Sequence, residues 1–293
     1  MSVLTAIGTR ILDYIKVWPL YCLPKHALSR LIFRLTRIEH VPWKNFLIRT
    51  FVSFYKVDIN QAIWASPDDY SSFNSFFTRE LKPDARRWKK DNNLILSPVD
   101  GFVSQIGNIT IDKLIQAKGM SYRLAILLAN DSKSVNQFED GCFATLYLSP
   151  SDYHRIHMPV TGRLIKSIYV PGDLFAVNTA SVRTVDQLCA RNERFISIFE
   201  TDLGLMAQIM VGAIFVGSME TVWSGQITPT NLRELTIKEY EHNPVELNQA
   251  DEFGRFNMGS TVILLFEKDK ISWLTDLHEN DVIQVGQAIG KVN

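Results

Sequence analysis

Apolar positions recur every three or four residues through most of the first 56 residues, which is the spacing of one face of an α-helix. This spacing predicts three amphipathic helices, over residues 3–15, 26–38 and 43–56. Prolines separate the three stretches, and proline lacks the amide hydrogen that a helix interior needs. A fourth helix is predicted to start at Ser66, a capping residue followed by proline and two acids, and to run through Phe77.

After residue 90 the pattern changes to short runs of alternating or continuous apolar and β-branched residues, separated by Gly, Pro, Asn and Asp. These runs predict strands over residues 94–97, 102–106, 144–148, 162–170, 194–199, 205–211, 214–219 and 261–266. The fold class expected from this order is α+β, with N-terminal amphipathic helices followed by an antiparallel-dominated domain of β-sandwich or barrel type. We place the boundary between residues 1–56, the helical segment, and residues 57–293, the β-rich domain.

Charge is distributed unevenly, although the formal net charge is zero. Residues 1–56 hold nine Lys and Arg and two acids, a net charge of +7, so residues 57–293 carry −7. Two interpretations of the basic helices are open. They pack on their own domain, or they form a monotopic membrane anchor with Trp18, Tyr21 and Trp43 near the lipid headgroups. No apolar run reaches 18 residues, so no transmembrane helix is expected.

The numbers and spacing of the cysteines and histidines bear on whether a disulfide framework or a metal site is to be expected. The three cysteines are an odd number at no metal-like spacing, which argues against a disulfide framework. His154 and His157 would share a face of a helical turn, or point to opposite sides of an extended segment. Zinc is the rival explanation for this pair, but no neighbouring Cys or Glu completes a ligand set, so no metal is expected. No nucleic-acid partner is expected either.

Three short stretches carry reactive residue types: Asp100 in SPVDG, His154 and His157 in YHRIHMP, and Ser260 in GST. Each has a structural alternative, because Asp, Ser and Thr also satisfy backbone groups in turns. Taken together they supply a relay in which an Asp orients a His and the His takes a proton from a Ser. A serine hydrolase is the generic expectation, yet the usual G-x-S-x-G elbow is absent.

A second reaction is open to Ser260, because a glycine carbonyl lies immediately before it. The hydroxyl can attack the carbonyl of Gly259 and convert the amide to an ester. Loss of the carboxylate by β-elimination leaves a dehydroalanine, which hydrolyses to a pyruvoyl group. Gly259 suits this route, since it has no Cβ to block the attack and tolerates unusual dihedral angles.

Several longer motifs point to one family. The sequence resembles the phosphatidylserine decarboxylases of the bacterial and mitochondrial type over nearly its whole length. The motifs, in chain order, are FNSFFTRELKPDAR (73–86), SPVDG (97–101), KGMSYRLAILL (118–128), YLSPSDYHRIHMPVTG (147–162), LFAVN (174–178), NER (192–194), VGAIFVGSM (211–219) and FGRFNMGSTVILLF (253–266). Two positions depart from the family pattern, Met258 for a usual Leu and Ala176 for a usual Pro, and neither removes a reactive group.

The resemblance implies a self-processing enzyme in which Asp100, His157 and Ser260 form the processing triad. The chain is expected to split between Gly259 and Ser260 into a β chain, 1–259, and an α chain, 260–293. Ser260 would become a covalent pyruvoyl group, the only cofactor implied. This group would form a Schiff base with the amine of phosphatidylserine and act as an electron sink, so that CO₂ leaves and phosphatidylethanolamine is formed.

The resemblance also assigns His154 and the membrane. His154 is the candidate for protonating or positioning the substrate, although its role and that of His157 could be exchanged. The lipid substrate favours the anchor interpretation of residues 1–56, with the enzyme on the cytoplasmic side of the cell membrane as a peripheral or monotopic protein and a homodimer as in the family. Two alternatives stay open: a membrane-associated serine hydrolase with an uncleaved Ser260, and a carrier-like module, suggested by the ending DVIQVGQAIGKVN.

Overall fold

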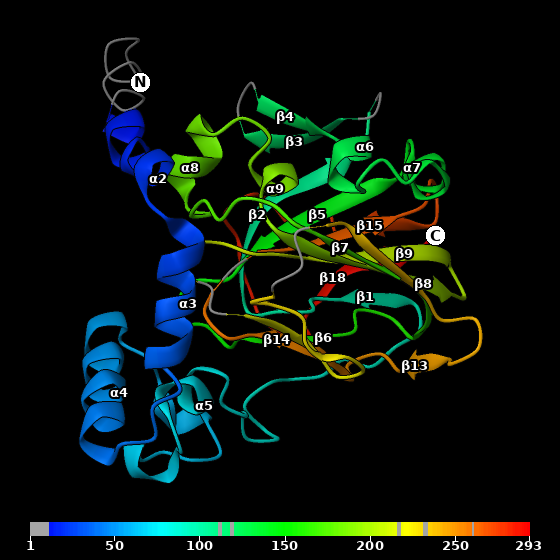
Figure 1. The fold of residues 1–293 in the computed structure, drawn as a ribbon. Coiled ribbons are helices and arrows are strands. Elements are labelled where there is room, and N and C mark those ends of the chain that lie inside the picture. Colours follow the sequence, from blue (N-terminus) through cyan, green and yellow to red (C-terminus); the bar gives the residue numbers. More distant parts are fainter. Residues whose placement is uncertain (1–11, 111–112, 118–119, 216–217, 231–233, 260) are drawn as a thin grey trace.

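The computed structural model describes residues 12–110, 113–117, 120–215, 218–230, 234–259 and 261–293. Helices at the N-terminal end lie along one side of a larger β-rich part (Figure 1). The strands pair antiparallel, and the described strands do not close into a barrel. The α+β fold class predicted from the sequence is therefore confirmed, in its sandwich form rather than its barrel form.

The predicted N-terminal helices are present, with shifted ends. Residues 12–17 are helical, while most of the predicted helix over 3–15 lies outside the described residues. The helices that follow are α2 (Pro19–Cys22), α3 (Lys25–Leu35) and α4 (Val41–Tyr55). Trp43 donates its indole N–H to the carbonyl oxygen of Leu35 at 3.0 Å, so this side chain joins α3 to α4. Among the described residues, no helix is long and apolar enough to cross a bilayer.

The single helix predicted from Ser66 to Phe77 is wrong, because the structure divides this stretch in two. Ser66 caps only a 3₁₀ turn, η2 (Pro67–Asp69), and the chain is extended at Tyr70. Ser72 then caps a new helix, α5 (Phe73–Phe77), by accepting a hydrogen bond from the amide of Ser75. A serine hydroxyl that bonds nearby backbone amides competes with a continuing helix, and this explains the break. A further 3₁₀ turn, η1 (Ile59–Gln61), precedes both.

A nine-stranded antiparallel sheet forms the centre of the molecule. Its main path runs in the order β12-β7-β8-β9-β15-β5-β2-β17, and β13 also pairs with β7. The strands are β2 (Gly101–Asn108), β5 (Cys142–Tyr147), β7 (Gly162–Val170), β8 (Arg194–Thr201), β9 (Gly204–Val211), β12 (Thr236–Glu239), β13 (Val245–Leu247), β15 (Thr261–Phe266) and β17 (Val282–Ile283). The strand that follows Ser260, β15, lies in the middle and pairs with β5 and β9 over its whole length.

Smaller sheets and short helices complete the β-rich part. The order of the four-stranded sheet is β11-β10-β14-β6, and that of the three-stranded sheet is β1-β18-β16. These strands are β1 (Leu94–Leu96), β6 (Arg155–His157), β10 (Met219–Thr221), β11 (Gly225–Gln226), β14 (Glu252–Phe256), β16 (Ile271–Trp273) and β18 (Ala288–Val292). The remaining elements are the hairpin β3 (Lys113–Ala117) with β4 (Met120–Arg123) and the helices α6 (Leu124–Leu127), α7 (Ser132–Phe138), α8 (Thr179–Thr184) and α9 (Leu188–Arg191).

One predicted strand, over 214–219, is wrong. Residues 214 and 215 lie in a turn, and the strand β10 begins only at Met219. Phe215 has a φ of 66°, a left-handed backbone conformation that ends an extended run. The apolar residues Ile214 and Phe215 therefore lie in a turn and do not pair with a neighbouring strand.

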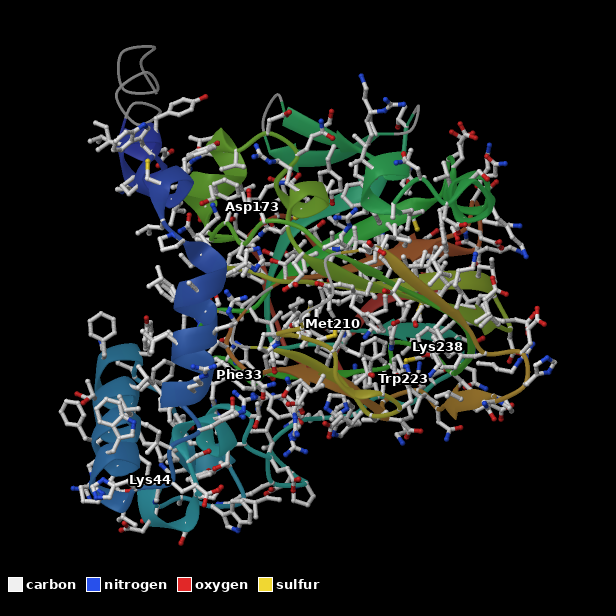
Figure 2. The ribbon with its side chains drawn as sticks, viewed as in Figure 1. Phe33, Lys44, Asp173, Met210, Trp223 and Lys238 are labelled. Carbon is white, nitrogen blue, oxygen red and sulfur yellow. The ribbon has the colours of Figure 1, made fainter. Side chains whose placement is uncertain are left out.

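Both faces of the sheet are buried at β15, which explains why this strand reads as a continuous apolar run. Val262, Leu264 and Phe266 pack in one cluster, and Ile263 and Leu265 pack in the cluster on the opposite face. Met210 and Trp223 belong to the first cluster, between the central sheet and the four-stranded sheet (Figure 2). Ser260 therefore precedes a strand that is fixed on all sides.

Candidate active site

The loop between β14 and β15 carries Gly-Ser-Thr, and Ser260 itself lies outside the described residues. A Cβ atom built on Gly259 would lie 3.1 Å from Nε2 of His154 and 3.5 Å from the carbonyl oxygen of Leu148. A side chain at position 259 would therefore crowd His154. A glycine is usually required either by a left-handed φ or by a close approach of other atoms. The φ of Gly259 lies outside the left-handed region, so the close approach of His154 explains the glycine.

Asn257 holds the same loop two residues earlier. Its side-chain nitrogen donates to the hydroxyl of Ser218 and, at 2.9 Å, to a carboxylate oxygen of Glu220. Its side-chain oxygen accepts from the amide nitrogen of Asn74 at 3.0 Å. Asn74 belongs to α5 and Glu220 to β10, so two elements far apart in the sequence fix the approach to Gly259.

His154 is fully buried against this loop. Its Nδ1 lies 2.8 Å from the carbonyl oxygen of Asp152, and its ring packs on Phe77 with centroids 4.1 Å apart. Nε2, the nitrogen that faces Gly259, has no hydrogen-bond partner among the described residues. Burial lowers the pKa of His154 to about 3, so the imidazole is neutral at neutral pH.

His157 lies in a different environment three residues later. Residues 155–157 form the strand β6, so the two histidines are on an extended segment and not on a helical turn. Nδ1 of His157 lies 2.9 Å from the carbonyl oxygen of Ala250, and Nε2 lies 3.1 Å from the hydroxyl of Tyr153. Burial lowers the pKa of His157 as well. Both ring nitrogens of His157 therefore have hydrogen-bond partners, whereas among the described residues only Nδ1 of His154 has one.

Asp100 lies next to β6 but does not bond to His157 in this structure. The segment is close, because the amide of His157 donates to the carbonyl oxygen of Pro98 at 2.9 Å. The carboxylate of Asp100 instead pairs with the guanidinium of Arg86 and accepts from the amide of Val285 at 2.8 Å. Burial is the main cause of the lowered pKa of His157; the carbonyl of Ala250 and the charge of Glu252 oppose it, and the charge of Asp100 raises this pKa to a smaller extent.

Of the four residues predicted from the sequence, the structure brings His154 to Gly259 and places Asp100 near His157. It shows no hydrogen bond between Asp100 and His157, and no contact is described for Ser260. Thr261 adds one further feature, because its buried hydroxyl also lacks a partner among the described residues. An unpartnered buried polar atom is unusual in a folded protein. Nε2 of His154 lies against Gly259, and Thr261 begins the strand β15.

A cavity with about 670 Å³ of empty space, part of it open to solvent, reaches Gly259. Its walls are mostly apolar and come from α4, from the 174–178 segment, from the 213–215 turn and from the loop before β15. The apolar lining residues include Phe51, Tyr55, Phe77, Val177, Phe215 and Met258. A mostly apolar lining of this kind suits the apolar part of a ligand.

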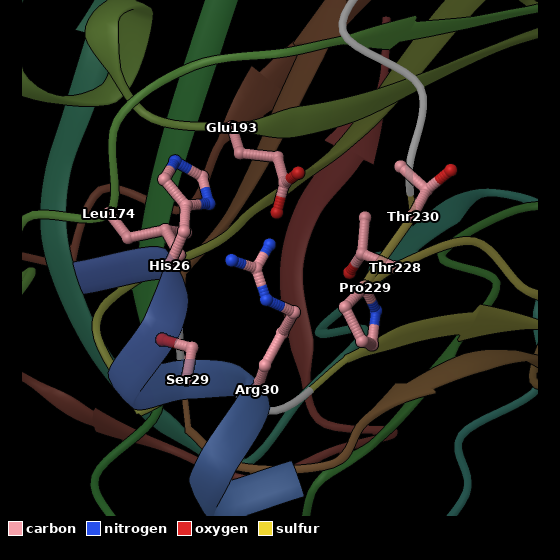
Figure 3. Close-up of a pocket in the computed structure, with 8 residues that line it drawn as sticks. All are labelled: His26, Ser29, Arg30, Leu174, Glu193, Thr228, Pro229 and Thr230. Carbon is pink, nitrogen blue, oxygen red and sulfur yellow. The ribbon is translucent and has the colours of Figure 1, made fainter. Parts of the chain in front are cut away.

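A smaller hollow lies where α3 meets the β-rich part, with about 300 Å³ of empty space including open solvent (Figure 3). His26, with Nε2 3.0 Å from the carbonyl oxygen of Gly172, and Ser29, which accepts from the amide of Phe215 at 3.2 Å, hold the helix there. Because Phe215 also lines the larger cavity, these contacts couple the position of α3 to the cavity wall.

Sequence reasoning missed the residues that support the predicted ones. Arg86 pairs with Asp100, Tyr153 and Trp88 contact the ring of His157, and Phe77 lies on His154. Arg86 and Phe77 lie within the FNSFFTRELKPDAR motif, and Tyr153 immediately precedes His154, but nothing in the letters says what these side chains touch. No group of three or more possible metal ligands occurs within the described part of the chain.

Comparison with known proteins gives a consistent result. A family model described as phosphatidylserine decarboxylase matches residues 73–291, and a second one, described as PSD, matches residues 15–56. A phosphatidylserine decarboxylase proenzyme of Nitrosococcus oceani is 45% identical over 284 residues, which cover 97% of this chain and 93% of that protein. The proenzyme of Alkalilimnicola ehrlichii is 51% identical over 256 residues, covering 87% of this chain and 88% of that protein.

Proposed function

The chain belongs to the phosphatidylserine decarboxylase family, and from this membership we propose that it is a self-processing carboxy-lyase that converts phosphatidylserine to phosphatidylethanolamine. The structural observation that carries the proposal is the free Nε2 of His154 against Gly259, on the wall of an apolar cavity. Purified protein should release CO₂ from phosphatidylserine vesicles and contain a 34-residue fragment, 260–293, with a blocked N-terminus. Active protein made only of intact 293-residue chains would contradict the proposal.

We propose cleavage between Gly259 and Ser260, with a β chain of 1–259, an α chain of 260–293 and a covalent pyruvoyl group derived from Ser260. The described residues fit such a group, because a polar atom without a partner among them, Nε2 of His154, is buried against Gly259, and the next residue described, Thr261, also has a buried hydroxyl without a partner among them. When present, the group supplies an electrophilic carbonyl and an electron sink for the carbon that loses CO₂.

The protein's own residues then have two tasks, and we propose different histidines for them. Asp100 and His157 serve processing together with Ser260, and the proximity of the Asp100 charge to His157 supports this pair. For this task the ring of His157 has to exchange its bond to Tyr153 for one to Ser260. His154, neutral and with no partner for Nε2 among the described residues, serves decarboxylation by positioning the substrate amine through a hydrogen bond to Nε2, or by protonating the substrate.

Replacing His154 with glutamine should leave self-cleavage intact and lower decarboxylation about a hundredfold or more, because general acid–base groups contribute roughly 10²–10⁴-fold. The measurement is CO₂ release per cleaved chain, with the cleaved fraction taken from intact mass. His278→Ala, at an exposed position, is the control and should behave as wild type. Loss of cleavage in His154→Gln would exchange the roles of the two histidines, and full turnover would remove His154 from the reaction.

We also propose that residues 1–56 hold the enzyme on the cytoplasmic face of an anionic membrane, where the lipid substrate is. The rest of the chain covers the apolar faces of these helices only in part: Val17 and Ile48 are buried, whereas many other large apolar side chains are exposed. The exposed large apolar side chains there are Leu12, Tyr14, Ile15, Trp18, Tyr21, Leu23, Leu31, Ile38, Val41, Phe46, Phe54 and Tyr55. Exposed basic residues accompany them, namely Lys16, Arg30, Arg34, Arg49 and Lys56. Exposed apolar and basic side chains together are typical of helices that lie in a lipid interface.

Not every basic residue of the segment is free for lipid. Lys44 is buried at the start of α4 and donates to the carbonyl oxygen of Pro67 at 2.9 Å (Figure 2). Lys25 is also buried and pairs with Asp173 at 3.0 Å. Trp43, predicted to lie near the headgroups, is half-buried by its bond to Leu35. The proposed contact with lipid therefore rests on Trp18 and Tyr21 and on the outer face of α4.

The outer face of α4 offers a test of membrane binding. Phe46 is 61% exposed and Phe54 is 75% exposed. Burial of one such side chain is worth about 1.5–3 kcal/mol, so Phe46→Ser with Phe54→Ser removes about 3–6 kcal/mol in all and should weaken partitioning onto anionic vesicles by roughly a hundredfold or more. The control is Leu235→Ser with Val282→Ser, two exposed apolar positions of the β-rich part. Equal losses in the two double variants, measured by vesicle co-sedimentation, would assign the exposed helices a role other than lipid contact.

We extend the proposal to the family's homodimer as well. The sedimentation coefficient of the detergent-solubilised enzyme checks this part separately, since a monomer would leave the reaction proposed above unaffected.

A further inference from the structure

Arg79, which follows α5, is buried in a way that fold stability does not explain. Only 5% of its surface is exposed, and Nε and Nη1 have no hydrogen-bond partner among the described residues. A buried donor without a partner lowers the stability of the fold. An apolar side chain of similar length would avoid this cost. The contacts that Arg79 does make are therefore the place to look for its role.

The guanidinium of Arg79 holds the loop that leads into His154. Its Nη2 donates to the carbonyl oxygens of Ser151, at 3.0 Å, and of Asp152, at 3.4 Å. The second of these carbonyls is the one that lies 2.8 Å from Nδ1 of His154. One carbonyl oxygen thus joins the arginine to the imidazole.

This shared carbonyl decides which nitrogen of His154 carries the hydrogen. A carbonyl oxygen only accepts, so Nδ1 has to be the protonated nitrogen and Nε2 keeps its lone pair. Phe77, two residues before Arg79, packs against the same ring. The segment that contains α5 and Arg79 therefore sets both the position of the ring and its tautomer, with the lone pair toward Gly259.

The charge of Arg79 acts in the same direction. Burial is the main cause of the low pKa of His154, and the nearby Arg79 lowers this pKa further, while the carbonyl of Asp152 opposes both. The carboxylate of Asp152 is turned to the amide of Ser149, from which it accepts at 2.6 Å. Arg79 is thus the charged group facing the ring that disfavours its protonation.

We propose that Arg79 is a positioning residue for His154: by holding the carbonyl of Asp152 and placing a positive charge beside the ring, it keeps Nε2 an unprotonated acceptor directed at the reacting junction. What this nitrogen accepts rests on the proposed function, namely a hydrogen bond from the amine of the aminophospholipid. The geometry itself is independent of that assignment, so the two can be tested separately.

The first test reads the tautomer and needs no turnover. Histidine labelled with ¹⁵N reports the state of each ring nitrogen, and His154→Gln identifies the signals of His154. We expect a protonated Nδ1 and a bare Nε2 in the wild-type protein, in cleaved and in uncleaved chains alike. A protonated Nε2 in the wild type would overturn the proposal without any variant of Arg79.

The second test varies the arginine. Arg79→Met should keep or raise the melting temperature, give a mixed tautomer at His154 and lower CO₂ release per cleaved chain by about tenfold to hundredfold, part of what a general acid–base group contributes. Arg79→Lys keeps the charge and should recover part of the loss. Arg194→Lys is the matched control, because Arg194 is also buried and donates to carbonyl oxygens, those of Leu127 and Ala190 among them. It should change stability and leave the tautomer of His154 and the turnover of folded protein as in wild type.

The outcomes separate the two proposals. A folded Arg79→Met with the wild-type tautomer and wild-type turnover would sink the role of Arg79 and leave the decarboxylase proposal standing. An absent α-chain fragment in wild type, with the expected tautomer at His154, would sink the reaction and leave the positioning role of Arg79 standing.

Discussion

Ser260→Ala should accumulate as one uncleaved 33.5 kDa chain and release no measurable CO₂ from phosphatidylserine. Alanine has no hydroxyl to attack the carbonyl of Gly259, so the amide-to-ester shift cannot begin and no reactive carbonyl is generated. The effect is complete because no other residue can supply the hydroxyl of position 260. Intact-mass spectrometry and a CO₂ assay on the same preparation measure both consequences.

Two further variants make this result specific. Ser272→Ala alters another serine of the 34-residue fragment and should cleave as wild type, with the fragment lighter by one oxygen. Ser260→Cys retains a nucleophile, so hydroxylamine should split the chain at position 259 through a thioester. Decarboxylation by Ser260→Ala at any rate above background would end the pyruvoyl assignment.

Asp100→Asn should slow self-cleavage by about a hundredfold to ten-thousandfold, the range of a lost acid–base partner. The carboxylate charge favours the protonated form of His157, so it makes the ring a better acceptor for the proton of the serine hydroxyl, and an amide does not. The rate of appearance of the 260–293 fragment in freshly refolded precursor is the quantity to measure.

The neighbouring arginine complicates this variant and also supplies its control. The Asp100 and Arg86 side chains are 9% and 8% exposed, and breaking a buried ion pair costs about 3–5 kcal/mol. Asp100→Asn with Arg86→Met removes the stranded charge and should recover stability without recovering cleavage. Recovery of cleavage in the double variant would reduce Asp100 to a structural partner of Arg86.

The spacing of apolar residues correctly predicted strands that are buried on one or both faces along their whole length. β7 and β15 have the predicted bounds, because continuous or alternating apolar letters suffice for strands with one or two buried faces. The method failed where a local conformation overrides the letters. Phe215 adopts a left-handed φ inside an apolar run, and Ser72 starts a new helix inside a helical pattern. Neither conformation changes the pattern of apolar and polar residues, so neither can be predicted from that pattern.

The candidate site was predictable as a set of residue types and not as a set of contacts. Asp, His and Ser point to a proton relay, and the family resemblance selects among its uses. Which histidine faces Gly259 depends on how β6 and the 149–153 loop pack, and residues 152 and 259 are more than a hundred positions apart. The proposed role of Arg79 is harder still to predict from the sequence, because it depends on a contact with a backbone carbonyl, and every residue has a backbone carbonyl.

The place of β15 between β5 and β9 has a consequence for the life of the mature enzyme. The fragment 260–293 that the proposed cleavage would release also contains β16, β17 and β18, so it would stay interleaved with residues 1–259 through two sheets. Heating would then release two separate polypeptides, whose reassembly is a second-order encounter that slows on dilution. The precursor can refold alone, whereas the matured protein, once melted, would show hysteresis and depend on concentration to recover.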